Sequence, residues 1–282
     1  MVKWRGRRRS SNVIDIRGNK GKAALGGGSI IVLLLALLFG VDPGQLLALL
    51  GDGGGAAIEQ VPADGAGAPP EDEASAFVAA ILADTEDTWN QLFQQAGASY
   101  QEPELVLFSD VVQSACGTAN AAVGPFYCPN DQRVYLDLGF FRRLQGLGAS
   151  GDFAVAYVIA HEIGHHVQNL EGTLSAVQAQ QRRLPAAGEN ALSVRTELQA
   201  DCYAGIWAHY AETERDFLHA GDVQEGIDAA AAVGDDYLQQ RSGQATVPES
   251  FTHGTSAQRV EAFQTGLRTG DVGACDTFAD LR

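Results

Sequence analysis

The spacing of apolar residues predicts strands early in the folded region and helices later. Apolar residues recur at helical intervals over 75–96, which predicts an amphipathic helix. The runs 104–112 and 132–138 are short, rich in β-branched and aromatic residues and bounded by turn residues, so they predict strands. Residues 114–131, between these runs, have the glycine, asparagine and proline content of a loop.

From Asp152 onward the pattern is helical almost to the end of the chain. Asp152 is a candidate N-cap for a helix that reaches Asn169, and a second helix is expected over 189–211. Further helices are expected within 212–240, and a last one after the capping residue Thr255. Strands early and helices late indicate the α+β class, with a small early β-sheet followed by a mainly helical part.

An uncharged apolar run, residues 23–41, follows a basic N-terminal segment. As a helix it would extend about 28 Å, close to the hydrocarbon thickness of a bilayer, which predicts an N-terminal transmembrane anchor. A cleaved signal peptide, whose apolar core is shorter, is the alternative. Residues 1–22 carry eight lysines and arginines against one acid, Asp15. This bias predicts a single-pass membrane protein with a cytoplasmic N-terminus and an extracytoplasmic folded domain.

Composition divides the rest of the chain into two parts. Residues 42–76 are rich in glycine, alanine, proline and acids and are expected to form a flexible linker, so the folded domain should span 77–282. The whole chain has a net charge of −16, and the part after the basic segment is more acidic still. Such a domain repels phosphate backbones, so no nucleic-acid partner is expected.

Four cysteines with no C-x-x-C motif suit an oxidising compartment and predict two disulfides. Four cysteines permit three pairings. Proximity in sequence favours Cys116 with Cys128, which leaves Cys202 and Cys275 to join a helix to the C-terminal tail. Four free buried thiols are the alternative.

The stretch "AHEIGHHVQ", residues 160–168, contains three of the six histidines. On a helix, His161 and His165 lie one turn apart on one face, so they can present two imidazoles to one Zn²⁺ ion. Glu162 lies about 100° around the helix, within reach of a water on that ion as general base. The flanking residues are apolar, and buried polar groups need partners. The sequence predicts a zinc site, with ordinary core histidines as the alternative.

The stretch "TELQADCYAG", residues 196–205, offers a third ligand. Glu197 and Asp201 are spaced i, i+4 and share one helix face. One carboxylate can therefore bind the metal while the other accepts a hydrogen bond from a ligand histidine. The small residues Gly205 and Ala208 continue this face, which predicts close packing against the first helix.

Other polar residues near these motifs are candidates for supporting roles. His166 follows His165 but lies about 100° away around the helix, so it is expected to pack or to support the site rather than to bind the same ion. His253, before the last helix, is a candidate for polarising the substrate carbonyl and stabilising an oxyanion, and Tyr203 is a second candidate. An ordinary loop histidine is the alternative for His253.

Four ordered blocks, "GPFYCPNDQRVYLD", "AHEIGHHVQ", "ELQADCYAGIWA" and "FTHGTSAQR", resemble the bacterial family of putative neutral zinc metallopeptidases. The resemblance spans about 111–275 and implies a zincin-like domain, similar to thermolysin, that binds Zn²⁺ and hydrolyses peptide bonds. It implies Glu197 as the third ligand and Asp201 as a supporting residue behind a ligand histidine. It also implies that "QRVYLD" is an edge strand that pairs with an extended substrate. The interval from His165 to Glu197 is longer than in thermolysin.

The mechanism that these residues imply is metal-assisted hydrolysis of a peptide or protein substrate. Zn²⁺ lowers the pKa of its water toward about 7, and Glu162 takes the proton and later gives it to the leaving amine. Two other hypotheses stay open. One is a zinc-stabilised binding module without activity on the cell surface; the other is a zinc hydrolase with Asp201 as a direct ligand.

Overall fold

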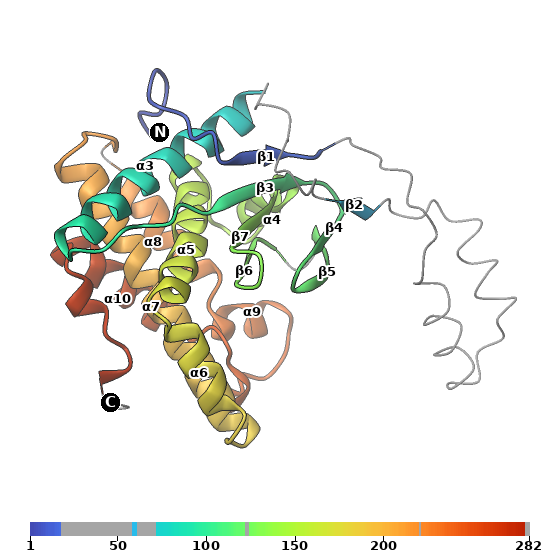
Figure 1. Ribbon diagram of the computed structural model, residues 1–282. Coiled ribbons are helices and arrows are strands. Elements are labelled where there is room, and N and C mark those ends of the chain that lie inside the picture. The colour runs from blue at the N-terminus through green and yellow to red at the C-terminus, as the bar shows by residue number, and fades with distance from the viewer. Residues whose placement is uncertain (18–57, 61–71, 122–123, 220, 280–282) are drawn as a thin grey trace, which may run out of the picture.

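The computed structural model describes residues 1–17, 58–60, 72–121, 124–219 and 221–279 of the 282-residue chain. These residues form a mixed α+β structure in which the strands lie beside a larger helical part (Figure 1). The α+β class expected from the sequence is therefore present, with the early strands and later helices in the expected order.

The described strands form a four-stranded and a three-stranded sheet. The larger sheet has the order β1-β3-β7-β6, in which β1, β3 and β7 are parallel and β6 is antiparallel to β7. The smaller sheet has the order β2-β4-β5. The strand bounds are β1 Val13–Asp15, β2 Ile58–Gln60, β3 Glu104–Phe108, β4 Val111–Ser114, β5 Gly117–Asn120, β6 Phe126–Cys128 and β7 Arg133–Asp137.

Most helices follow the pattern expected from apolar spacing, with bounds that differ by a few residues, whereas the helix Gly139–Gly146 was not predicted. The long helices of the core are α3, α5, α7 and α10, and the shorter ones lie around them (Figure 1). The bounds are α3 Glu73–Gln95, α4 Gly139–Gly146, α5 Asp152–Leu170, α6 Thr173–Gln181, α7 Ala186–Thr213, α8 Asp222–Ala232, α9 Asp235–Arg241 and α10 Ser256–Thr269, with 3₁₀ helices at η2 Pro248–Ser250 and η3 Val272–Cys275. Gly151, not Asp152, is the N-cap of α5.

Glycines let the central helices approach each other closely. A Cβ on Gly164 of α5 would lie 2.9 Å from the carbonyl oxygen of Ala200 on α7, so these two helices touch backbone to backbone. Gly205 was expected to face the same helix, but its position is different. A Cβ there would lie 2.0 Å from the carbonyl oxygen of Phe263, so Gly205 packs against α10. Helix α7 thus contacts α5 on one face and α10 on another.

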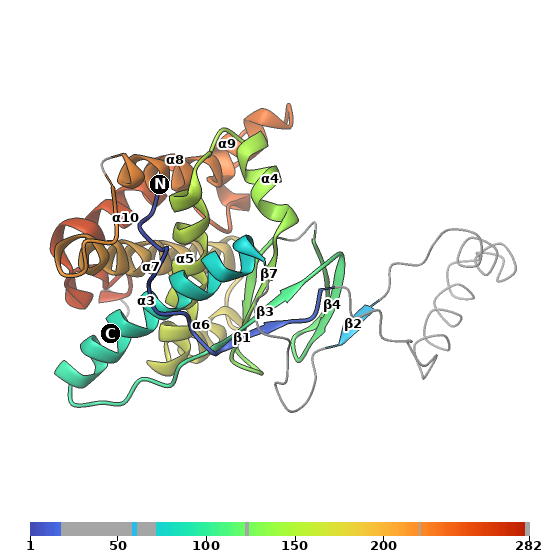
Figure 2. The ribbon, with the colours of Figure 1, turned by 90° about the horizontal axis from the view of Figure 1, so that it is seen from above.

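The N-terminal segment is an integral part of the folded structure. β1 pairs with β3, and the side chains of Val2, Trp4, Ile14 and Ile16 are buried. The ring of Trp4 meets that of Phe77 on α3 edge to face, with centroids 5.7 Å apart. Figure 2 shows the segment crossing the helical part before it enters the sheet as β1. Residues 1–17 therefore complete both the core and the sheet.

The structure corrects the prediction of a transmembrane anchor. No helix of the described residues is long and apolar enough to cross a membrane. Residues 23–41, which carried the prediction, lie outside the described residues. The predicted single-pass topology with a cytoplasmic N-terminus is corrected as well, because the basic segment lies on the folded domain. Its charges pair with acids there: Arg8 with Glu86 at 2.8 Å and Arg17 with Asp72 at 2.8 Å.

Three expectations about the strands also need correction. The run 104–112, expected to be one strand, forms two, β3 and β4, which belong to different sheets. The strand that contains "QRVYLD", β7, has neighbours on both sides, β3 and β6, so it is not an edge strand. The edge next to it is β6, within the stretch expected to be a loop. β6 has only three residues, and its pairing with β7 over Tyr127 and Val134 holds it in place. A strand this short leaves no clear alternation in the sequence.

Both disulfides expected from proximity are confirmed. Cys116 is bonded to Cys128 across a sequence separation of 12 residues. Cys202 on α7 is bonded to Cys275 at the end of η3, with a separation of 73 residues.

Candidate metal centre

Helices α5 and α7 bring three donor side chains to one point. His161 and His165 project from one face of α5, and Glu197 reaches them from α7. The Nε2 atom of His161 is 3.1 Å from Oε2 of Glu197, and Nε2 of His165 is 3.4 Å from Oε1 of the same carboxylate. One donor atom from each residue lies within 4.8 Å of the other two. Two imidazole nitrogens and a carboxylate in this arrangement suit Zn²⁺ and leave a fourth position open.

Asp201 and Arg259 form a buried ion pair next to His161. Nδ1 of His161 is 2.8 Å from Oδ1 of Asp201, which is fully buried. Arg259 of α10 donates to both oxygens of that carboxylate, at 2.8 and 2.9 Å. The hydroxyl of Tyr157, one turn before His161, also donates to Asp201. A carboxylate held by these donors fixes the ring orientation of His161 and keeps Nε2 directed at Glu197.

The electrostatics of the cluster match a bound cation. Burial alone would lower the pKa of His161, but Asp201 and Glu197 raise it to about 10. Burial would raise the pKa of Asp201, but Arg259 and His161 lower it to about 2. Burial raises the pKa of Glu162. Histidines that bind a metal are neutral. The carboxylates of Glu162, Glu197 and Asp201 then have only the guanidinium of Arg259 as a positive partner, so the residues present fit a divalent cation.

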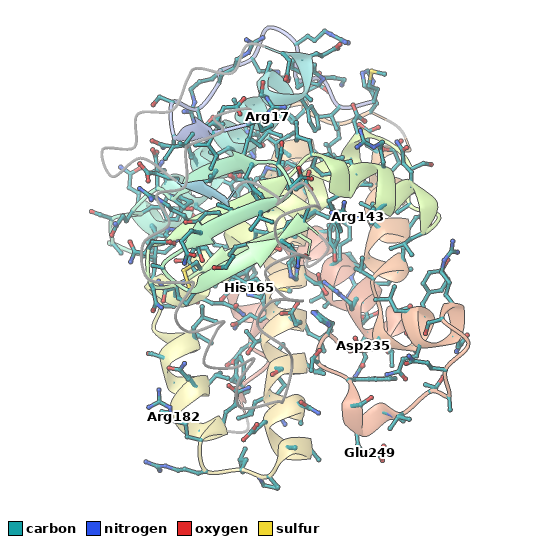
Figure 3. The ribbon with its side chains drawn as sticks, turned by 90° about the vertical axis from the view of Figure 1, so that its right-hand side faces the viewer. Arg17, Arg143, His165, Arg182, Asp235 and Glu249 are labelled. Atoms are coloured by element: carbon teal, nitrogen blue, oxygen red, sulfur yellow. A yellow bond between two sulfur atoms is a disulfide. The ribbon has the colours of Figure 1, made fainter. Side chains whose placement is uncertain are left out.

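The three donors lie in a cavity of about 470 Å³ between the β6 edge and the helices. Glu162 also lines the cavity, beside the two histidines. Figure 3 shows His165 just below the strands. The rest of the lining is mainly apolar. It comprises residues 124–127 from β6 and the turn before it, together with Phe140, Leu147, Val158, Val233 and Leu238, and it also includes Tyr157, His253 and Arg259.

His253 lines the same cavity and is held there by an aspartate. Its Nδ1 atom is 3.2 Å from Oδ1 of Asp235, the first residue of α9. The other oxygen of Asp235 accepts backbone N–H groups from Thr252, His253 and Gly254 at 2.7 to 3.0 Å. Half of the His253 side chain remains exposed. One carboxylate thus fixes both the loop and the ring, and Figure 3 shows Asp235 on the same side as His165.

Two other side chains considered from the sequence face away from the donors. His166 is buried, with Nε2 2.6 Å from the carbonyl oxygen of Gln101 and Nδ1 3.0 Å from the hydroxyl of Tyr127. Tyr203 is also buried and donates its hydroxyl to Glu171 at 2.8 Å. His166 therefore packs helix α5 onto the strands, as expected, whereas Tyr203 is outside the cavity lining and is corrected as an oxyanion candidate.

Sequence reasoning did not assign roles to Tyr157, Asp235 or Arg259. Tyr157 could have been found, because it precedes His161 by one helical turn on the same face. Arg259 ends the block "FTHGTSAQR", and no local pattern in the sequence indicates that its side chain is buried. Asp235 lies 18 residues before His253 with no motif linking the two. Its role depends on how α9 packs beside the loop.

The fold and the site define an α+β protein with an H-E-x-x-H helix and a facing carboxylate. Residues 2–278 match the family described as "putative neutral zinc metallopeptidase", and the chain belongs to this family. Uncharacterized protein YpfJ of Escherichia coli (strain K12) is 44% identical over 287 residues, covering 98% of this chain and 99% of that protein. Uncharacterized protein Rv2575 of Mycobacterium tuberculosis (strain ATCC 25618 / H37Rv) is 43% identical over 269 residues, covering 87% and 86%. No solved structure matches the chain.

Proposed function

We propose that this protein is a zinc-dependent peptidase in which His161, His165 and Glu197 hold the metal and Glu162 is the general base. The convergence of the three donors beside Glu162, in a cavity large enough for a peptide segment, carries the proposal. Membership of the metallopeptidase family supports it.

Each group around the metal position has a separate role in hydrolysis. A bound zinc ion would polarise the scissile carbonyl and lower the pKa of the attacking water. Glu162 takes the proton of that water and then delivers it to the leaving amine. His253 sits at the rim of the cavity with Nδ1 engaged by Asp235, so Nε2 donates to the developing oxyanion in the form of the ring that carries a hydrogen on both nitrogens.

The substrate backbone would lie along β6. This strand ends the four-stranded sheet of the described residues, and the turn and strand residues 124–127 line the cavity. An edge strand offers unpaired N–H and C=O groups that an extended peptide can use as an added strand. Such pairing fixes the peptide in register without reading its side chains.

Cleavage of a mixed peptide library tests the proposed function. The full-length protein should cut peptides when loaded with zinc, lose activity when zinc is removed by a chelator, and regain it when zinc is returned. Mass spectrometry of the products would also reveal the side-chain preference. Absence of cleavage from a protein that binds one zinc ion would instead favour a zinc-stabilised binding module.

Replacing the two carboxylates of α7 separates ligand from supporting residue. We expect Glu197→Ala to abolish tight zinc binding, because it removes one of three donors. Asp201→Asn should weaken zinc binding by only about 10–100-fold, since Asp201 contacts Nδ1 of His161 rather than the metal position. Chelator competition measures both affinities. The reverse order would make Asp201 the direct ligand.

His253→Ala should lower kcat by about 10²–10³-fold, the usual effect of removing an oxyanion donor. Zinc affinity should stay at the wild-type value, because His253 is not among the converging donors. His219→Ala is the matched control: this histidine is exposed and does not line the cavity. Steady-state kinetics on a cleaved library peptide measure the effect. Activity of His253→Ala within twofold of wild type would remove His253 from the mechanism.

A further inference from the structure

A chain of buried amides supports the second ligand histidine. Nδ1 of His165 is 2.9 Å from Oε1 of Gln168, three residues further along α5. The amide nitrogen of Gln168 donates to the carbonyl oxygen of Thr196 at 2.8 Å and to Oε1 of Gln199 at 2.9 Å, both on α7. The amide nitrogen of Gln199 in turn donates to the carbonyl oxygen of Cys275 at 3.2 Å. Gln168 and Gln199 are both buried.

The two backbone carbonyls determine the direction of every hydrogen bond in this chain. A carbonyl oxygen can only accept, so Gln199 must turn its NH₂ group to Cys275 and its oxygen to Gln168. Gln168 then faces two acceptors, Thr196 and Gln199, and must point its NH₂ group at them. Its own oxygen is left for His165. An amide oxygen accepts only, so the hydrogen on the His165 ring must sit on Nδ1.

We propose that Gln168 is a positioning residue that, with Gln199, holds His165 as the Nδ1–H tautomer and so presents Nε2 as the metal donor. The inference rests on the proposed role of His165 as a zinc ligand. A histidine whose other nitrogen carries the hydrogen has its Nε2 lone pair free, and here Nε2 faces the Glu197 carboxylate at 3.4 Å.

The same chain also fixes the position of the facing ligand. Thr196 directly precedes Glu197, and Gln199 follows it by two residues. Gln168 therefore ties the α5 segment that carries His165 to the α7 segment that carries Glu197. His161 is supported differently, by the charged pair of Asp201 and Arg259. The two ligand histidines thus have separate supports, which can be removed one at a time.

Gln168→Met tests the proposal, because methionine has a similar length and no strong donor or acceptor. We expect zinc affinity, measured by chelator competition on the full-length protein, to fall about 10–100-fold. Gln199→Met should have a smaller effect, since Thr196 still orients Gln168. Gln181→Met is the matched control: Gln181 also links two helices, α6 to α7, through Glu189 and Ser193, but contacts no histidine.

Nitrogen NMR of ¹⁵N-histidine-labelled, zinc-free protein gives an independent readout, because zinc bound at Nε2 would by itself leave the hydrogen on Nδ1. The wild type should show one form of His165 with its hydrogen on Nδ1, and Gln168→Met should show a second form. Wild-type affinity and a single form in Gln168→Met would overturn the proposal, as would an equal loss of affinity in Gln181→Met. If His165→Ala left zinc affinity unchanged, the proposed function itself would fail.

Discussion

Glu162→Gln is expected to abolish peptide hydrolysis while zinc stays bound. Glutamine matches the shape of glutamate but cannot accept the proton of the attacking water. General acid–base catalysis contributes about 10²–10⁴-fold, so kcat should fall by that factor. Zinc binding should persist, because the three converging donors are His161, His165 and Glu197. Cleavage rates and the zinc content of the purified variant together measure the effect.

The informative control for this variant is Glu171→Gln. Glu171 caps the same helix, α5, and accepts a hydrogen bond from Tyr203, but it does not line the cavity. It should leave turnover close to the wild-type value. Full activity of Glu162→Gln would assign the base to another group, and loss of zinc from it would make Glu162 a ligand.

Deleting residues 1–17 should prevent stable folding of the rest of the chain. The deletion removes β1 from the sheet and takes several buried apolar side chains out of the core, among them Trp4, Ile14 and Ile16. Each such side chain contributes about 1.5–3 kcal/mol when buried. Their sum is comparable with the whole free energy of unfolding of a typical domain, about 5–15 kcal/mol. Circular dichroism and thermal denaturation of the deleted protein measure the loss.

A single substitution also tests whether the N-terminal segment contributes to stability, with a smaller change to the protein. Ile16 is fully buried, and Ile16→Ala should lower the free energy of unfolding by about 2–5 kcal/mol. Arg9→Ala, at an exposed position of the same segment, should change it little. A cooperative, wild-type melting transition for the deletion protein would show that the segment does not contribute to the stability of the domain. Equal melting temperatures for these two variants would show the same.

The basic segment shows how one sequence pattern can have two physical meanings. Eight bases before an apolar run indicate a cytoplasmic flank when only the sequence is considered. In the folded chain several of these bases instead pair with acids of the domain, for example Arg8 with Glu86 and Arg17 with Asp72. Charge counts along a chain do not reveal such pairs, because the partners lie far apart in sequence.

The sequence by itself determined the features that depend on local periodicity. His161 and His165 share a face of α5 because four residues make about one helical turn, whatever the helix packs against. The same spacing puts Glu197 and Asp201 together on one face of α7. These features hold for any tertiary arrangement of the helices.

Only the tertiary structure determined which groups form hydrogen bonds with the residues of the site. Arg259, Asp235 and Gln199 reach the site from other elements, and their contacts depend on where α10, α9 and α7 lie. Gly205 meets α10 rather than α5 for the same reason. The position of β6 at the end of the four-stranded sheet of the described residues and the parallel pairing of β1 with β3 likewise depend on contacts between distant parts of the chain. Local periodicity determines which way a side chain points on its helix, but packing between helices and strands determines what it meets.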